Sequence, residues 1–180
     1  MRNELTRETA HALMRELARS APRRGSYRVY LIGGTTAVLS GWRAATVDAD
    51  LYCEHDEIFR DIQRIKDALQ VNVELVRPGQ LVPELAGSSE RHVFVETIDR
   101  VSFYHYDPYA QVLSKVVRGL RRDMEDANHF LDSGMVDADK LRALVVAIPA
   151  PAYSRYPHLS KAAVDAAVNE FLDNRLKAAR

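Results

Sequence analysis

The sequence is poor in the residues that form disulfides and zinc sites. It contains a single cysteine, Cys53, among 180 residues, which excludes an internal disulfide and a cysteine-rich zinc site. Its six histidines show no His-x-x-x-His spacing and no pairing with the cysteine, so the pattern does not favour zinc. Disulfide-stapled and zinc-dependent classes are therefore disfavoured.

The sequence also lacks an excess of charge and any long apolar run. Its 25 basic side chains equal its 25 acidic ones, so no global field would collect nucleic acid, although a local basic patch is compatible with this balance. No apolar run is long enough to span a membrane, and the residues after Met1 lack the apolar core of a signal peptide. We therefore expect a cytoplasmic protein that makes no membrane contact.

Apolar residues make up 47% of the chain, and their spacing alternates between strand and helix periods. The pattern predicts an α/β fold in which helices flank a small mixed sheet of four or five strands, followed by a helical C-terminal part. We expect one domain over 1–148, and over 149–180 a proline-containing linker and a helix packed on or beside that domain. The expected strands are 27–32, 46–53, 71–76, 92–96 and 100–106, and the expected helices are 4–20, 57–69, 108–120, 124–131, 137–148 and 160–176.

The most informative segment is a glycine pair between a buried strand and a short helix. Gly33 and Gly34 allow the backbone to approach a phosphate, and the N–H groups from Gly34 to Thr36 would face that anion at the helix start. Either Thr35 or Thr36 is expected to cap the helix and to assist with its hydroxyl. A turn of this kind also occurs in α/β proteins without phosphate ligands, so its meaning depends on the residues that follow.

Two aspartates, Asp48 and Asp50, follow in the next expected strand. Alternate strand residues share a face, so both carboxylates can reach one cation. Aspartate is unfavourable in strands, and two close carboxylates repel each other until a cation neutralises them. Mg²⁺ fits an all-oxygen ligand set and can bridge substrate phosphates, and Mn²⁺ accepts similar ligands. Together, the glycine pair and the aspartates predict a site for a metal–triphosphate.

A charged stripe further along the chain is open to two interpretations. On a continuous helix at about 100° per residue, Lys115, Arg122 and Asp126 lie within about 40° of one another, with apolar positions such as Leu120 facing the other way. Such a stripe is compatible with a solvated helix face carrying an Arg122–Asp126 pair, which contributes only tenths of a kcal/mol. It is equally compatible with a nucleotide site, because a lysine can neutralise triphosphate charge.

In its motifs the chain resembles the nucleotidyltransferase superfamily, whose members include DNA polymerase beta and aminoglycoside nucleotidyltransferases. Within that superfamily it is most similar to the small bacterial branch that contains the AbiEii-type toxins and related uncharacterised nucleotidyltransferases. The motifs run from about Tyr30 to Leu131 and make 1–148 a nucleotidyltransferase-like domain by resemblance. They are Gly33-Gly34-Thr35, Asp48-Ala49-Asp50, Leu113-Ser114-Lys115 and Arg122-Asp123-Met124-Glu125-Asp126.

The resemblance implies roles for further residues. An acid on a neighbouring strand would complete the metal site or activate the acceptor hydroxyl; Glu74 is the candidate, with Asn72 a weaker one on the same face. An acid of the later helical region would orient the lysine that neutralises the triphosphate, and the choice between its two aspartates stays open. The members of the nucleotide site in this region would be Lys115, Arg122, Asp123 and Asp126.

The function implied is transfer of a nucleoside monophosphate from a nucleoside triphosphate to an acceptor hydroxyl, with Mg²⁺ or Mn²⁺ as cofactor. Similarity to the toxin branch adds transfer RNA or a protein as candidate acceptors, and a toxin role opposed by an antitoxin partner. A non-catalytic relative that keeps the fold as a binding module or toxin-system partner is an open alternative. A glycosyltransferase is disfavoured because it does not explain the glycine pair, and an aspartyl phosphatase because it would need threonine or valine at Tyr52.

Overall fold

The computed structural model describes residues 2–178, which form two compact units. The first unit contains the residues up to Arg77 together with His92–Tyr106, and the second contains Pro78–Arg91 together with the residues from Asp107 onward. Residues 149–178 belong to the second unit along with the helices that precede them. Within residues 2–178, every helix is too short or too polar to cross a bilayer.

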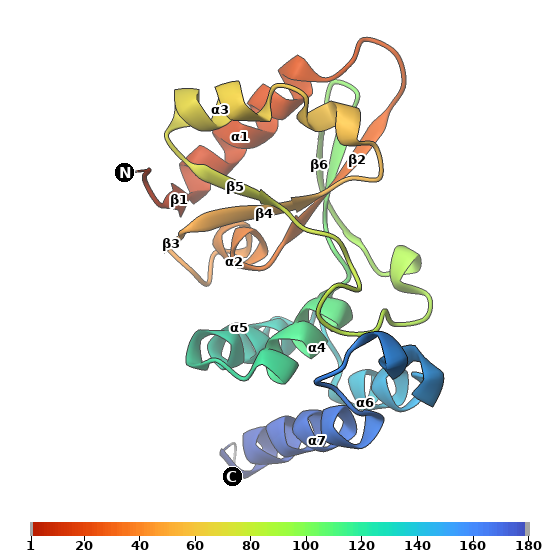
Figure 1. Cartoon of the computed structure of the whole chain (residues 1–180). Helices are drawn as coiled ribbons and strands as arrows, with labels where there is room; N and C mark the ends of the chain where they lie inside the picture. Colours follow the sequence, from red (N-terminus) through yellow and green to blue (C-terminus); the bar gives the residue numbers. More distant parts are fainter. Residues whose placement is uncertain (1, 179–180) are drawn as a thin grey trace. The chain divides into compact units, whose positions relative to one another are not determined.

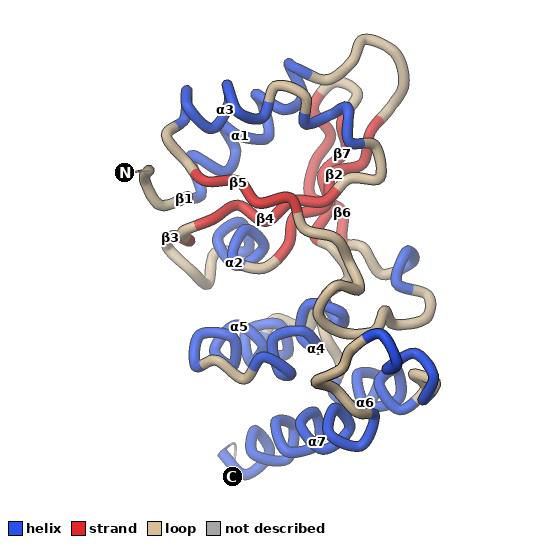
Figure 2. The backbone as a smooth tube through the Cα atoms, in the orientation of Figure 1, coloured by secondary structure: helices blue, strands red, loops and turns tan. Residues whose placement is uncertain are grey.

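A five-stranded mixed sheet is the centre of the first unit (Figure 2), which confirms the sheet expected from the sequence. The strands are β1 Leu5–Thr6, β2 Tyr27–Ile32, β3 Ala45–Thr46, β4 Asp48–Tyr52, β5 Asn72–Leu75, β6 Val93–Ile98 and β7 Val101–His105. The order in the sheet is β5-β4-β2-β7-β6. Strand β2 runs parallel to β7 and antiparallel to β4, whereas β5 runs parallel to β4 and β6 antiparallel to β7. The short strands β1 and β3 pair separately.

Two helices cover one face of this sheet. Helices α1 (Arg7–Ser20) and α3 (Ile62–Leu69) lie side by side on it (Figure 1). Their apolar stripes pack against alternate strand residues such as Ala49 and Leu51, both 0% exposed. Because side chains alternate along a strand, Asp48, Asp50 and Tyr52 lie on the opposite face and are half-buried. We call this opposite face the aspartate face.

The short helix α2 (Gly34–Ser40) starts earlier than the sequence predicts. The capping residue is Gly33, and neither Thr35 nor Thr36 caps the helix; both lie inside its first turn. The expectation of a threonine cap is therefore wrong. The reason is that both threonine hydroxyls bond to neighbouring strands, which leaves the glycine backbone to make the turn. Helix α2 packs beside β3 and β4.

The second unit is helical (Figure 2). Its helices are α4 Pro108–Arg118, α5 Arg121–Asp132, α6 Ala138–Val146 and α7 Lys161–Ala178. Helix α4 packs against α5 and α7, and α6 packs against α7. The aspartate of the Asp107-Pro108 start accepts a hydrogen bond from the Tyr109 N–H, which confirms this N-cap. Short 3₁₀ turns lie at Asp56–Phe59 in the first unit and at Ser88–Glu90 and Ala150–Arg155 in the second.

The continuous helix assumed for the charged stripe is interrupted. Gly119 has φ 67, a left-handed conformation that ends α4 at Arg118, and α5 begins two residues later. Leu120, expected on the apolar side, is 61% exposed. The angular relation predicted for Lys115, Arg122 and Asp126 is therefore wrong, because it depends on an unbroken helix.

Candidate functional site

The glycine turn lies directly against one of the aspartates. A Cβ built on Gly33 would lie 2.5 Å from Asp50 Oδ2, and one on Gly34 would overlap the side chain of Thr46. Gly33 also has φ 58 with ψ −125, a combination open to glycine and strained for other residues. Both positions thus require glycine, because the Asp50 and Thr46 side chains leave no room for a Cβ. The Asp50 carboxylate lies at the bend between β2 and α2.

Buried polar contacts hold this turn in place. The Thr35 hydroxyl accepts a hydrogen bond from the Asp50 N–H at 3.1 Å. The Thr36 hydroxyl donates to the Leu31 carbonyl at 3.0 Å and lies 3.2 Å from His105 Nδ1. Both threonines are almost fully buried. The structure therefore gives Thr35 and Thr36 a positioning role at the turn.

His105 is a neutral part of this network. Burial lowers its pKa from the ordinary 6.5 to about 4. The single Thr36 hydroxyl proton is used toward Leu31, so Nδ1 of the neutral ring must carry the proton that binds Thr36. A histidine in an aromatic strand offers no local sequence signal of such a contact.

The two aspartates and the candidate acids of β5 share the aspartate face. In the parallel pairing of β4 with β5, Asp48 lies opposite Asn72 and Asp50 lies opposite Glu74. Residues in such register project to the same side of a sheet. The Asn72 amide oxygen accepts a hydrogen bond from Arg2 at 3.1 Å, whereas Glu74 is exposed. Of the two β5 candidates, Glu74 is thus the one that borders Asp50.

The carboxylates suit an ion that takes few protein ligands. Over residues 2–178, no three His, Cys, Asp or Glu side chains are grouped closely enough to hold a metal ion. The metal role of Glu74 accordingly stays a prediction. Mg²⁺ usually keeps several waters and binds one or two carboxylates together with substrate phosphates. Asp48 and Asp50 on one face, beside a glycine turn, fit that pattern and also fit Mn²⁺.

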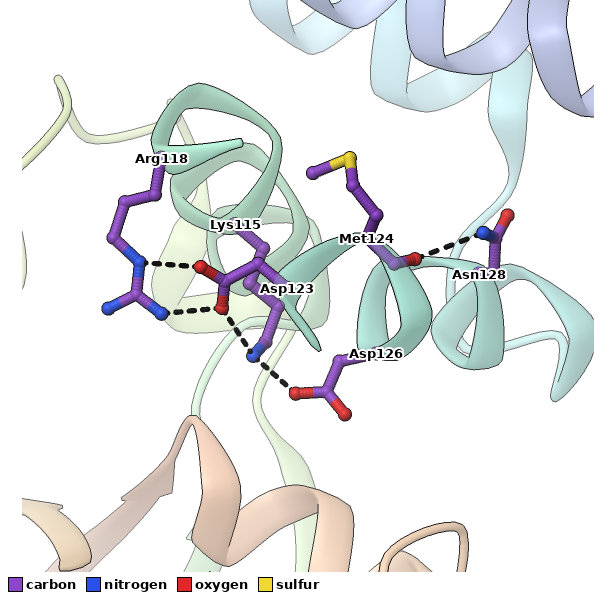
Figure 3. Close-up of polar contacts among 6 residues, drawn as sticks. All are labelled: Lys115, Arg118, Asp123, Met124, Asp126 and Asn128. Carbon is purple, nitrogen blue, oxygen red and sulfur yellow. Dashed lines mark hydrogen bonds and ion pairs between the residues drawn. The ribbon is translucent and has the colours of Figure 1, made fainter. Parts of the chain in front are cut away.

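A buried ion cluster lies in the second unit, between α4 and α5 (Figure 3). Lys115 Nζ donates to Asp126 Oδ2 at 2.6 Å and to Asp123 Oδ1 at 3.4 Å. Arg118 forms a fork with Asp123 at 2.9 Å and 2.5 Å. The Lys115, Asp123 and Asp126 side chains are 6%, 5% and 3% exposed. The structure therefore joins Lys115 to both aspartates between which the sequence did not choose.

This cluster first explains the packing of α4 against α5. Lys115 and the two aspartates neutralise one another where they are buried, and Arg118, whose side chain is 47% exposed, adds a second cation at the edge of the cluster. Arg122, predicted for the nucleotide site, is exposed, and an i,i+4 ion pair on this helix joins Arg121 to Glu125. A role of Lys115, Arg122, Asp123 or Asp126 at a nucleotide stays a prediction. Sequence reasoning missed the Arg118–Asp123 fork, because the helix break at Gly119 creates it.

One comparison with known proteins identifies a relationship. A family model described as "Nucleotidyltransferase of unknown function (DUF6036)" matches residues 9–174. The matched range contains the glycine turn, the aspartates of β4, Glu74 and the whole Lys115 cluster. No curated protein and no solved structure matches the chain significantly.

Proposed function

The chain belongs to this nucleotidyltransferase family, and on that premise we propose that it transfers a nucleoside monophosphate from a nucleoside triphosphate to an acceptor hydroxyl. The acceptor oxygen forms a bond to the α-phosphorus while the bond from that phosphorus to the pyrophosphate oxygen breaks. The products are a nucleotidylated acceptor and pyrophosphate, and the hydroxyl proton passes to a base. Among the acids of the aspartate face, Glu74 is the candidate base.

The observation that carries this proposal is the contact between the glycine turn and Asp50. The Asp50 carboxylate lies against the backbone of this turn, with Oδ2 2.5 Å from the position that a Cβ would take at Gly33. It is useful where a cation must lie beside a backbone that binds phosphate. The N–H groups of Gly34 and Thr35 precede the first intrahelical bond, which the Ala37 N–H donates to the Gly33 carbonyl.

Mg²⁺, or Mn²⁺ in its place, would be held by Asp48 and Asp50 and would supply charge neutralisation at the phosphates. The protein's own contribution is positioning: the Thr35–Asp50 bond fixes β4 against α2, and the neutral His105 fixes Thr36. Because phosphoryl transfer depends mainly on positioning and electrostatics, removing either aspartate should raise the barrier by about 3 kcal/mol or more. That corresponds to roughly a hundredfold loss of rate.

The test uses the full chain with nucleoside triphosphates labelled at the α-phosphate, Mg²⁺, total RNA and cell lysate. Wild-type protein is expected to label at least one acceptor. Asp48→Asn and Asp50→Asn should lose labelling while keeping the wild-type circular dichroism spectrum. Asp56→Asn, an exposed aspartate of the same unit, is the matched control and should keep it. Equal labelling by wild type and Asp48→Asn would refute the proposal.

We also assign the chain a toxin role opposed by an antitoxin partner, because its motifs resemble those of AbiEii-type toxins. The expected phenotype is growth arrest on expression of the wild-type chain, and normal growth on expression of Asp48→Asn at the same protein level. Equal growth of the two strains would remove the toxin role. It would leave nucleotide transfer as a separate question, decided by the labelling assay.

A second candidate function is a nucleotidyltransferase-fold binding module without catalysis. It is favoured by the fact that, within residues 2–178, no third acid groups with the two aspartates. Calorimetry with Mg²⁺ and each nucleoside triphosphate separates the candidates. A catalytic site binds at least one nucleotide in a manner that requires Mg²⁺ and Asp50, whereas an emptied site binds none.

A further inference from the structure

The aspartate face carries a second feature, a row of aromatic rings next to the acids. The strand register places Tyr52, Tyr30, Tyr104 and Phe94 opposite one another across β4, β2, β7 and β6. Directly opposed residues project to the same face. Since Asp50 precedes Tyr52 by two residues, this aromatic row lies one step along the strands from Asp50, about 7 Å away.

The rings form a continuous series of contacts. Tyr30 stacks on Tyr52 with centroids 5.7 Å apart and lies 6.1 Å from Tyr104, which in turn meets Phe94 edge-on at 5.5 Å. His92 packs 4.4 Å from Tyr30. Tyr30 is 6% exposed, Tyr52 and Tyr104 on either side of it are half-buried, and Phe94 at the end of the row is 57% exposed. A large aromatic ring this exposed on an edge strand gains little from the core of its own unit.

Positive charge lies beyond the row. Arg28 is two residues before Tyr30 on the same face, and its guanidinium carbon is 5.9 Å from the Tyr104 ring centroid. Along the strands, the face therefore runs from carboxylates suited to a cation, through aromatic rings, to an exposed arginine. Rings that can stack bases, combined with a cation for the backbone, are the chemistry by which proteins bind single-stranded nucleic acid.

We propose that this aromatic row binds the end of a single-stranded nucleic acid and that this strand is the acceptor. The inference rests on the proposed function for the acceptor's role, but not for the binding itself. The row spans three strand intervals, about 14 Å, so the base of one nucleotide at Asp50 would not reach the exposed Phe94. A strand of several bases covers the row, with a backbone phosphate at Arg28 and its terminal hydroxyl toward the aspartates.

The test measures binding without catalysis. A fluorescently labelled single-stranded RNA decamer of mixed sequence is titrated with the full chain in EDTA and without nucleotide, and anisotropy is recorded. Phe94→Ala should weaken binding by roughly five- to a hundredfold, the effect of losing one stacked base. The matched control is Leu75→Ala, because Leu75 is 51% exposed on the other edge strand and alternates away from the aspartate face. This control should bind like wild type.

Two further variants separate stacking from general charge. Tyr104→Phe keeps the ring and should keep binding, whereas Tyr104→Leu should lose it. Arg28→Gln should weaken binding and reduce the salt dependence by about one phosphate contact. Repeating the titration with a DNA decamer of the same sequence tests whether the protein recognises the sugar. A duplex of the same sequence should bind more weakly.

Binding that is absent in wild type, unchanged in Phe94→Ala, or equal for the duplex would overturn the inference. These outcomes are independent of those of the labelling assay. Loss of nucleotide transfer with intact, Phe94-dependent strand binding would remove the proposed function and keep this surface. Nucleotide transfer to a protein acceptor, together with strand binding that Phe94→Ala does not change, would keep the proposed function and remove this surface.

Discussion

Replacing Lys115 by methionine tests the buried ion cluster of the second unit most sharply. The change keeps a long unbranched side chain but removes the ammonium group that lies 2.6 Å from Asp126 and 3.4 Å from Asp123. Asp123 retains the fork from Arg118, so the electrostatic loss falls mainly on Asp126. Removing one partner of a buried ion pair costs about 3–5 kcal/mol of unfolding free energy, and we expect a loss in that range.

The assay is urea denaturation followed by far-UV circular dichroism, because the second unit is helical while Trp42, the one tryptophan of the sequence, belongs to the first. Arg121→Met is the control, since Arg121 is 93% exposed in its pair with Glu125 and should lose less than about 0.5 kcal/mol. Adding Asp126→Asn to Lys115→Met should recover part of the loss by removing the buried negative charge that Lys115 had balanced. A loss below about 1 kcal/mol for Lys115→Met would refute the reasoning.

Three further predictions concern the first unit. Gly33→Ala should displace the Asp50 carboxylate and lower stability by about 1–3 kcal/mol, and nucleotide transfer should be lost with it. Gly34→Ala should be rescued by Thr46→Gly, which removes the overlapping side chain, and denaturation of the single and double variants checks this. Because the pKa of His105 is lowered to about 4, the unfolded chain binds more protons between that pH and 6.5, and stability falls as the pH drops through this window. Between about pH 7.5 and pH 5, wild type should lose about 2 kcal/mol more unfolding free energy than His105→Gln. Equal losses in both proteins would contradict the assignment of His105 as a buried neutral group.

The sheet could be predicted because the patterns that specify its strands lie within short stretches of the sequence. Apolar runs, period-2 alternation and the Asp107-Pro108 helix start each depend on a few neighbouring residues, and the five strands and the N-cap are found where these patterns lie. The strand expected over 46–53 is divided at Val47, because Thr46 pairs with β1 and packs on Gly34. That division depends on residues far away in the sequence and could not be read from the strand itself.

The candidate site shows the same limit. The glycine pair and the aspartate spacing were recognisable, but the close approach of Gly33 to Asp50 required the fold. The charged stripe was wrong in its geometry because one positive-φ glycine at position 119 separates two helices that an angular calculation treats as one. The break turns Asp123 and Asp126 together toward Lys115, and it leaves Arg122 exposed.

The most direct test of the central claim is binding of Mn²⁺, a paramagnetic substitute for Mg²⁺, measured by electron paramagnetic resonance in the presence of a non-hydrolysable nucleoside triphosphate. Wild-type protein should bind the nucleotide-complexed ion, and Asp50→Asn should bind it at least tenfold more weakly, while Asp56→Asn binds as wild type does. Equal affinity of wild type and Asp50→Asn would show that the cation is not held beside the glycine turn.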